Sequence, residues 1–174
     1  MESERNFIPK PEKPLVLYHA SKNAGIKTFE PRIGKRRDEN EGAQVFATPS
    51  KAMATIFLVE TDDSWTQSGA MDGVPYIIIS DKERFTQLDT GGTIYSLPSD
   101  TFETDLEKGL RELEYTSNEA VEPTDAEHFP SALSAMLENG VKVYFVDKET
   151  FENIKTADDH GEEIVKNLTP LPSN

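Results

Sequence analysis

The stretch LVLYHASKNAGIKTFEPR, Leu15 to Arg32, is the part of the sequence that says most about the fold. It begins with the apolar run 15–18, which predicts a strand that is apolar on both faces and therefore central in its sheet. The run stops at His19, and the small residues Ala20 and Ser21 follow at once. Small residues let a ligand approach the backbone closely, so this strand end is a candidate ligand site. A histidine here can equally be a structural residue whose ring is hydrogen-bonded to a backbone carbonyl.

The composition describes an acidic, folded domain without cysteine. The 174 residues contain 32 Asp and Glu against 18 Lys and Arg, which gives a formal net charge of -14. A surface of this sign repels a phosphate backbone, so nucleic acid is not an expected partner. The absence of cysteine excludes disulfides, thiol catalysis and thiolate metal ligands. The three histidines, His19, His128 and His160, lack the spacing of a zinc site, so no metal is expected.

The chain is expected to fold as one domain between two extended ends. Residues 1–14 contain three prolines and predict an extended N-terminal arm, residues 15–168 predict a single domain, and the tail 169–174 is expected to fray. The N-terminal residues lack the apolar core of a signal peptide, and no apolar run reaches the roughly 20 residues of a membrane helix. We therefore expect a soluble, cytoplasmic protein without a membrane partner.

The pattern of apolar residues predicts a mixed α+β domain. Alternation and apolar runs predict strands at 15–19, 44–47, 74–79, 93–97, 112–117 and 141–146, and helical periodicity predicts helices at 49–60, 129–139, 148–155 and 160–168. The segments 34–42 and 62–73 are expected to be loops, and 89–92 a tight turn. Strands and helices do not alternate regularly, so a mixed sheet with a few helices is favoured over a doubly wound fold.

A second candidate ligand-binding edge precedes the first predicted helix. Thr48 is expected to be the N-cap of this helix and Pro49 its first residue, because both residue types favour those positions. Phe46 and Ala47 lie directly before the helix N-terminus, where free N–H groups and the helix dipole attract anions. Helix capping alone also explains Thr48 and Pro49. On the helix, the expected buried stripe consists of Ala52, Met53, Ile56, Phe57 and Val59.

Two charged clusters could also contribute to a site. The densest basic cluster lies in the segment 31–37 and consists of Arg32, Lys35, Arg36 and Arg37. Guanidinium groups donate paired hydrogen bonds to phosphate oxygens, so this loop could close over a diphosphate, whereas a solvated loop would have the same composition. Glu112 and Glu114 would share one face of a strand, because side chains alternate. In a chain this acidic, such pairs also arise by chance.

Taken in order, these segments resemble the ADP-ribosyltransferase fold, whose members include poly(ADP-ribose) polymerases, rifamycin-modifying ADP-ribosyltransferases and tRNA 2'-phosphotransferases. The strand end His19-Ala20-Ser21 is similar to the His-Gly-Thr or His-Gly-Ser of this family, and Val45–Thr48 resembles the start of its second conserved segment. The segment Tyr115–Val121 is similar to one in the rifamycin-modifying group. The resemblance covers residues 15–123 and includes a loop, 26–42, like the one that lies over NAD.

The resemblance implies an α+β domain with a mostly antiparallel, split sheet and NAD as the donor substrate in its cleft. His19, with Tyr18 beside it, would hydrogen-bond a ribose hydroxyl. The backbone of Ala20 would hold the nicotinamide amide, and Ser21 would support that end. Ala20 stands where the family has glycine.

The resemblance also implies roles for residues farther along the chain. Phe46 and Thr48 would line the pocket, and Arg32 would face the diphosphate. Val45 stands where many members have a tyrosine or histidine that stacks on nicotinamide. A carboxylate would stabilise the cationic transition state as nicotinamide leaves. Glu114 is the first choice for this catalytic acid, together with His19 as the second catalytic residue, and the alternatives for the acid are Glu112 and Glu119.

Three functions follow from the resemblance. The first is NAD-dependent ADP-ribosyl transfer to a small-molecule or protein acceptor. The second is a catalytically inactive module of the same fold that binds a nucleotide or a protein. The third is phosphotransfer chemistry on an RNA 2'-phosphate, which the net charge of -14 opposes.

Overall fold

The computed structural model describes residues 12–32, 42–104 and 113–173, and these residues form a mixed α+β fold, as the sequence predicts. The elements in chain order are β1 (Val16–Ser21), β2 (Val45–Ala47), α1 (Lys51–Ile56), β3 (Thr66–Met71), β4 (Val74–Ile79), α2 (Lys82–Leu88), β5 (Gly92–Pro98), β6 (Tyr115–Ser117), β7 (Asp125–Phe129), α3 (Ala132–Glu138), β8 (Lys142–Phe145), α4 (Lys148–Thr156) and α5 (Glu162–Lys166). Helix α2 and strand β7 were not expected. Most of the predicted arm 1–14 and of the predicted loop 34–42 lies outside the described residues.

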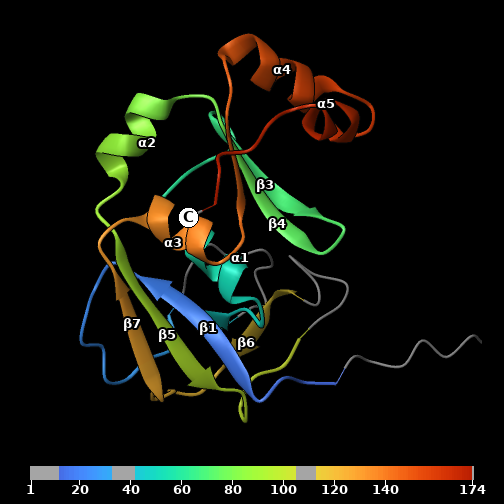
Figure 1. The fold of residues 1–174 in the computed structure, drawn as a ribbon. Helices are drawn as coiled ribbons and strands as arrows, with labels where there is room; N and C mark the ends of the chain where they lie inside the picture. The colour runs from blue at the N-terminus through green and yellow to red at the C-terminus, as the bar shows by residue number, and fades with distance from the viewer. Residues whose placement is uncertain (1–11, 33–41, 105–112, 174) are drawn as a thin grey trace, which may run out of the picture.

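Within the described residues, the strands form three sheets, and the pairing is mostly antiparallel, as expected. One sheet has the order β1–β5–β7, the second pairs β2 with β6, and the third has the order β3–β4–β8, in which β4 and β8 are parallel. Strand β1 therefore lies at the edge of its sheet and not in the centre as predicted, and it continues past His19 to Ser21. Backbone hydrogen bonds between Tyr18 and Thr48, at 2.7 and 2.9 Å, join the edge of β1 to the residue after β2. Figure 1 shows the sheet of β1, β5 and β7 at one end of the molecule and α4 and α5 at the other.

The β3–β4 hairpin confirms one prediction and corrects another. The predicted strand 74–79 is β4, but the segment 62–73, expected to be a loop, contains its partner β3. The two strands pair from Met71 and Val74 outward across a two-residue turn. In this turn Asp72 and Gly73 have φ angles of 52° and 78°. Asp-Gly favours such turns because both positions need positive φ, so the sequence did contain a hairpin signal.

Helix α1 is shorter than predicted at both ends. Its N-cap is Ser50, whose side chain accepts a hydrogen bond from the backbone N–H of Met53 at 3.0 Å. The preceding Thr48-Pro49 lies outside the helix, because the backbone of Thr48 is already paired with β1. The helix ends at Ile56, and Phe57 is 58% exposed, so the prediction that Phe57 belongs to the buried stripe is wrong.

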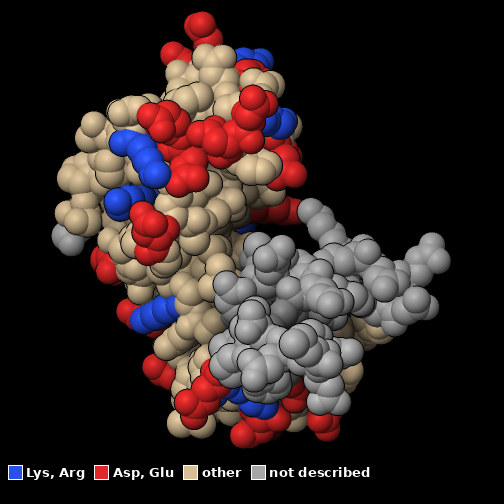
Figure 2. All heavy atoms as spheres, turned by 90° about the vertical axis from the view of Figure 1, so that its right-hand side faces the viewer, with Lys and Arg blue, Asp and Glu red and all other residues tan. Residues whose placement is uncertain are grey.

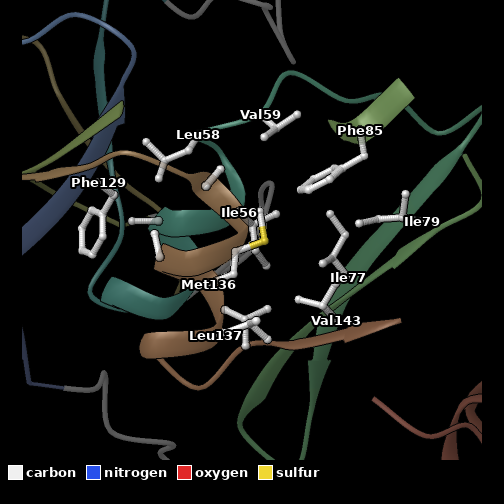
Figure 3. Close-up of a cluster of buried hydrophobic side chains, with 14 of the residues drawn as sticks. Ile56, Leu58, Val59, Ile77, Ile79, Phe85, Phe129, Met136, Leu137 and Val143 are labelled. Atoms are coloured by element: carbon white, nitrogen blue, oxygen red, sulfur yellow. The ribbon is translucent and has the colours of Figure 1, made fainter. Parts of the chain in front are cut away.

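The largest core lies between α1, α3 and the sheet of β3, β4 and β8 (Figure 3). Its buried side chains include Met53, Ile56, Leu58, Val59, Ile77, Ile79, Phe85, Met136, Leu137 and Val143. Full burial of an aliphatic or aromatic side chain of this size contributes about 1.5–3 kcal/mol to folding. Tyr18 and Ala20 of β1 also pack against this cluster, so the same core connects the first sheet to the third.

Helix α3 begins at Ala132 and not at 129 as predicted, because Phe129 is the last residue of β7. Its N-cap Ser131 is supported by the carboxylate of Asp89, which precedes β5. This carboxylate accepts hydrogen bonds from the Ser131 hydroxyl (3.0 Å) and from the backbone N–H groups of Ala132 (2.6 Å) and Leu133 (3.0 Å). Negative charge at a helix N-terminus is favourable, so Asp89 fixes α3 to the start of β5.

Helices α4 and α5 cover the outer face of the third sheet. Phe151, Ile154 and Val165 pack against Ile78 and Tyr144 in a separate buried cluster. Figure 2 shows that the surface at this end of the molecule is rich in acidic side chains, which agrees with the negative net charge. Among the helices of the described residues, none combines the length and apolarity needed to cross a membrane.

The C-terminal tail is attached to the third sheet at one residue. Leu171 lies within the segment that was expected to fray, yet its backbone N–H donates to the carbonyl oxygen of Val143 in β8 at 2.9 Å. Leu171 also packs against the largest core. The tail therefore covers part of the free edge of β8.

Candidate functional site

A partly open cavity of about 300 Å³ lies at the end of β1, between this strand, the following segment 21–32 and β2. Its walls combine an imidazole, hydroxyl and amide groups, two phenylalanine rings and one charge of each sign. The described residues that line it are His19, Ser21, Asn23, Ile26, Thr28, Phe29, Glu30, Arg32, Gln44, Val45 and Phe46. Small-molecule sites have volumes from about 300 Å³ upward, so this cavity suits a small polar group or one end of a larger ligand.

His19 has a defined tautomer in this cavity. Its Nδ1 lies 2.6 Å from the carbonyl oxygen of Phe46, and because a carbonyl only accepts, Nδ1 carries the proton and donates it. Burial lowers the pKa of His19, the hydrogen bond to Phe46 opposes this effect, and the positive charge of Arg32 lowers the pKa further. The imidazole is therefore neutral at neutral pH, and its Nε2 is a hydrogen-bond acceptor.

The ring of His19 is also held from the side by Phe29. The two ring centroids are 4.8 Å apart at an interplanar angle of 61°, an edge-to-face contact. Phe29 is itself buried, and its backbone pairs with Val121 through hydrogen bonds of 2.8 and 2.9 Å. The imidazole thus lies between a carbonyl group of β2 and a ring that is anchored to the segment after β6.

Two exposed charged residues, Glu30 and Arg32, line the cavity on its outer side. The backbone of Arg32 pairs with that of Gln44 at 3.0 and 2.9 Å, which fixes this residue beside the start of β2. The Gln44 amide donates to the side-chain oxygens of Thr116 and Asn118, each at 3.4 Å. The other members of the predicted basic cluster, 35–37, lie outside the described residues.

The structure brings four of the predicted site residues to this cavity, namely His19, Ser21, Arg32 and Phe46. The side chains of Tyr18 and Ala20 lie on the opposite face of β1, because side chains alternate along a strand, and they pack against the largest core. Thr48 does not line the cavity either. It is 5% exposed, and its hydroxyl accepts a hydrogen bond from the N–H of Ser50 at 3.2 Å.

The acidic residues proposed for catalysis are not among the described lining residues. Glu114 directly precedes β6, and its backbone carbonyl accepts a hydrogen bond from the Thr104 hydroxyl at 2.8 Å. Glu119 is exposed beyond the end of β6, and Glu112 lies outside the described residues. The predicted strand 112–117 is shorter in the structure, because β6 begins only at Tyr115 and the described residues 113 and 114 precede it. Among the described residues, the acidic residue that lines the cavity is Glu30.

The backbone N–H and C=O groups of Ala20 point to the edge of β1 that faces away from β5. The N–H and C=O groups of Tyr18 bond to Thr48 on the side of β1 that faces away from β5. Backbone groups alternate in direction along an antiparallel strand, so those of Ala20 point to the same side as those of Tyr18. Beyond Thr48 the chain turns into α1, and within the described residues no strand pairs with Ala20 on this side.

Several lining residues were not found by sequence reasoning. Asn23, Ile26, Thr28 and Glu30 follow β1 in a segment without periodicity and were not singled out as residues, although the resemblance had placed the loop 26–42 over NAD. Gln44 could have been predicted, because side chains two residues apart in an extended segment point to the same side, and Gln44 lies two residues before Phe46.

Comparisons of this chain with models of protein families, with curated proteins and with solved structures found no match. Among the described residues, no three His, Cys, Asp or Glu side chains gather as a metal site would require. The geometry of the cavity is therefore the basis for a functional proposal.

Proposed function

We propose that the protein binds NAD in this cavity and transfers its ADP-ribosyl group to a small-molecule or protein acceptor. The observation that carries the proposal is the meeting of His19, Ser21, Arg32 and Phe46 around one small volume. These residues come from three separate segments, and the resemblance to ADP-ribosyltransferases implies a contact with NAD for each of them.

The chemistry of the cavity suits the nicotinamide ribose end of NAD. The Nε2 atom of His19 accepts a hydrogen bond, which a ribose hydroxyl can donate. The backbone N–H and C=O groups of Ala20 are one donor and one acceptor on the edge of β1 away from β5, which matches the one acceptor and one donor of a carboxamide. The Phe46 ring offers a stacking surface worth about 1 kcal/mol, and Arg32 offers a cation to the diphosphate.

The proposed reaction breaks the bond between the ribose C1' atom and the nicotinamide nitrogen. Nicotinamide leaves with the bonding electron pair, and the acceptor forms a new bond to C1' and loses a proton. Positive charge develops on the ribose as the bond breaks, and a nearby carboxylate stabilises it. Glu30 lines the cavity, and Glu114, which directly precedes β6, is the acid that the resemblance implies, so these two carboxylates are the candidates for this role.

Nicotinamide release from NAD, measured by chromatography, tests the proposal. We expect release by the wild-type protein and a fall of at least about a hundredfold in His19→Ala and in one of Glu30→Gln and Glu114→Gln. His160→Ala and Glu138→Gln are matched controls, because both residues are exposed and lie outside the cavity. Absence of both release and saturable NAD binding at millimolar NAD would contradict the proposal.

A second candidate function is NAD binding without turnover. Two observations favour it over catalysis. Val45, at the position of the family's stacking aromatic, is an aliphatic residue buried in a cluster with Phe29 and Tyr95, and Glu114 is not among the described lining residues. Saturable binding of NAD in calorimetry, without release of nicotinamide by the same sample, would select this function.

A further inference from the structure

The hydroxyl of Tyr95 in β5 holds two backbone groups of the cavity wall. It donates a hydrogen bond to the carbonyl oxygen of Asn23 at 2.5 Å and accepts one from the N–H of Ile26 at 3.1 Å. Both partners line the cavity, whereas Tyr95 is only 1% exposed and is not a lining residue. One buried side chain is therefore hydrogen-bonded to both ends of the turn 23–26.

The ring of Tyr95 supports the same wall at a second point. Its centroid lies 5.0 Å from that of Phe29 at an interplanar angle of 76°, and Phe29 in turn makes its edge-to-face contact with His19. His19 and Tyr95 are also direct partners in the pairing of β1 with β5. Three rings in contact thus connect β5 to the imidazole in the cavity.

We propose that Tyr95 is a positioning residue, whose hydroxyl holds the turn 23–26 in the shape that admits the ligand without touching the ligand itself. The affinity part of this inference rests on the proposed function of the cavity as an NAD site. Tyr95→Phe keeps the ring contacts with Phe29 but leaves the Asn23 carbonyl and the Ile26 N–H without their partner. The wall can then open locally while the strands remain paired.

The test combines amide hydrogen exchange of the unliganded protein, measured by NMR, with calorimetric titration of NAD. In Tyr95→Phe we expect the Ile26 amide to exchange at least about tenfold faster, because its acceptor is gone. The Phe29 amide should keep its protection, because its acceptor is the carbonyl oxygen of Val121. We expect the Kd for NAD to rise about tenfold. The matched control is Tyr144→Phe, which removes the hydroxyl of a buried tyrosine in β8, and all three values should stay at wild type.

Unchanged exchange at Ile26 would overturn the positioning role, and so would an unchanged Kd in a variant whose Ile26 exchange has risen. Equal acceleration at Ile26 and Phe29 would indicate general loosening and would also overturn it. If the wild-type protein does not bind NAD, the proposed function fails on that result, and the exchange pattern at Ile26 and Phe29 alone decides whether Tyr95 positions the wall.

Discussion

The two faces of strand β1 differ in their neighbours and in their chemistry. Tyr18 and Ala20 pack against the apolar core that α1 and α3 share with the third sheet, whereas His19 and Ser21 line a cavity with both polar and apolar walls. Adjacent residues of a strand point to opposite faces, so one short segment can support the fold on one face and line a candidate ligand site on the other. We therefore expect mutations on one face of β1 to change stability without changing binding, and mutations on the other face to change binding without changing stability.

The two faces also differ in how their residues are held. A core residue such as Ile77 is fully buried among many apolar neighbours, and its removal leaves a cavity in close-packed surroundings. His19 is held by the hydrogen bond to Phe46 and by the edge of Phe29. Changes in the core should therefore affect stability first, and changes at the cavity should affect the ligand first.

The largest expected effect on stability comes from Ile77→Ala in β4. Removing three carbon atoms from a fully buried isoleucine should lower the free energy of unfolding by about 3 kcal/mol. Because the cavity lies on the other side of β1, the folded variant should bind NAD with the wild-type Kd. Urea denaturation and calorimetric titration measure the two quantities. A tenfold weaker affinity for NAD in the folded variant would contradict the claim that the two faces of β1 act independently.

A smaller effect is expected from Asp89→Ala, which removes the carboxylate at the start of α3. The hydrogen bonds to Ser131, Ala132 and Leu133 are lost together with one from the Gly91 N–H, which should lower the free energy of unfolding by about 2 kcal/mol. The control is Asp158→Ala, at an exposed position between α4 and α5, and its stability should match the wild type. An equally stable Asp89→Ala variant would show that α3 is held by its apolar contacts alone.

The smallest expected effect is a pH dependence of the free energy of unfolding that comes from His19 on the cavity face of β1. Burial lowers the pKa of His19 in the folded state, so the unfolded chain takes up a proton first as the pH falls below about 6.5. The wild-type protein should therefore lose stability as the pH falls from neutral through about 6.5 and below, and His19→Gln should lose less over the same range. Urea denaturation across this range gives the comparison, with His160→Gln as a control that retains His19. Identical slopes in the wild type and His19→Gln would contradict the burial of a neutral imidazole.

Much of the apolar framework could be predicted from the sequence. The apolar run 74–79 is long enough to specify β4, and His19 and Phe46 were recognised as site residues from their local sequence, although β1 does not end at His19 and continues to Ser21. Strand β3 was missed because Gly69 and the small polar residues around it lack the alternation of a half-buried strand. The Asp-Gly turn that follows would have identified the hairpin.

The rest of the cavity depends on contacts between remote segments. Phe29 reaches its position by pairing with Val121, and the turn 23–26 is fixed by Tyr95 from β5. No local pattern reports such pairings, so the lining residues Asn23, Ile26 and Glu30 could not be predicted. Thr48 shows the reverse case, because its type favours a helix cap, but its pairing with Tyr18 leaves the cap to Ser50.

The most direct test of the two-face account is a titration of NAD followed through the backbone amide signals of the protein in NMR. We predict saturable shifts of the amide signals of residues 19–32 and 44–46. The signals of the third sheet, residues 66–79 and 142–145, should stay nearly unchanged. The same titration of His19→Ala should show weakened or absent saturation. No shift at millimolar NAD, or shifts centred on the third sheet, would contradict the claim that the cavity face of β1 is the ligand site.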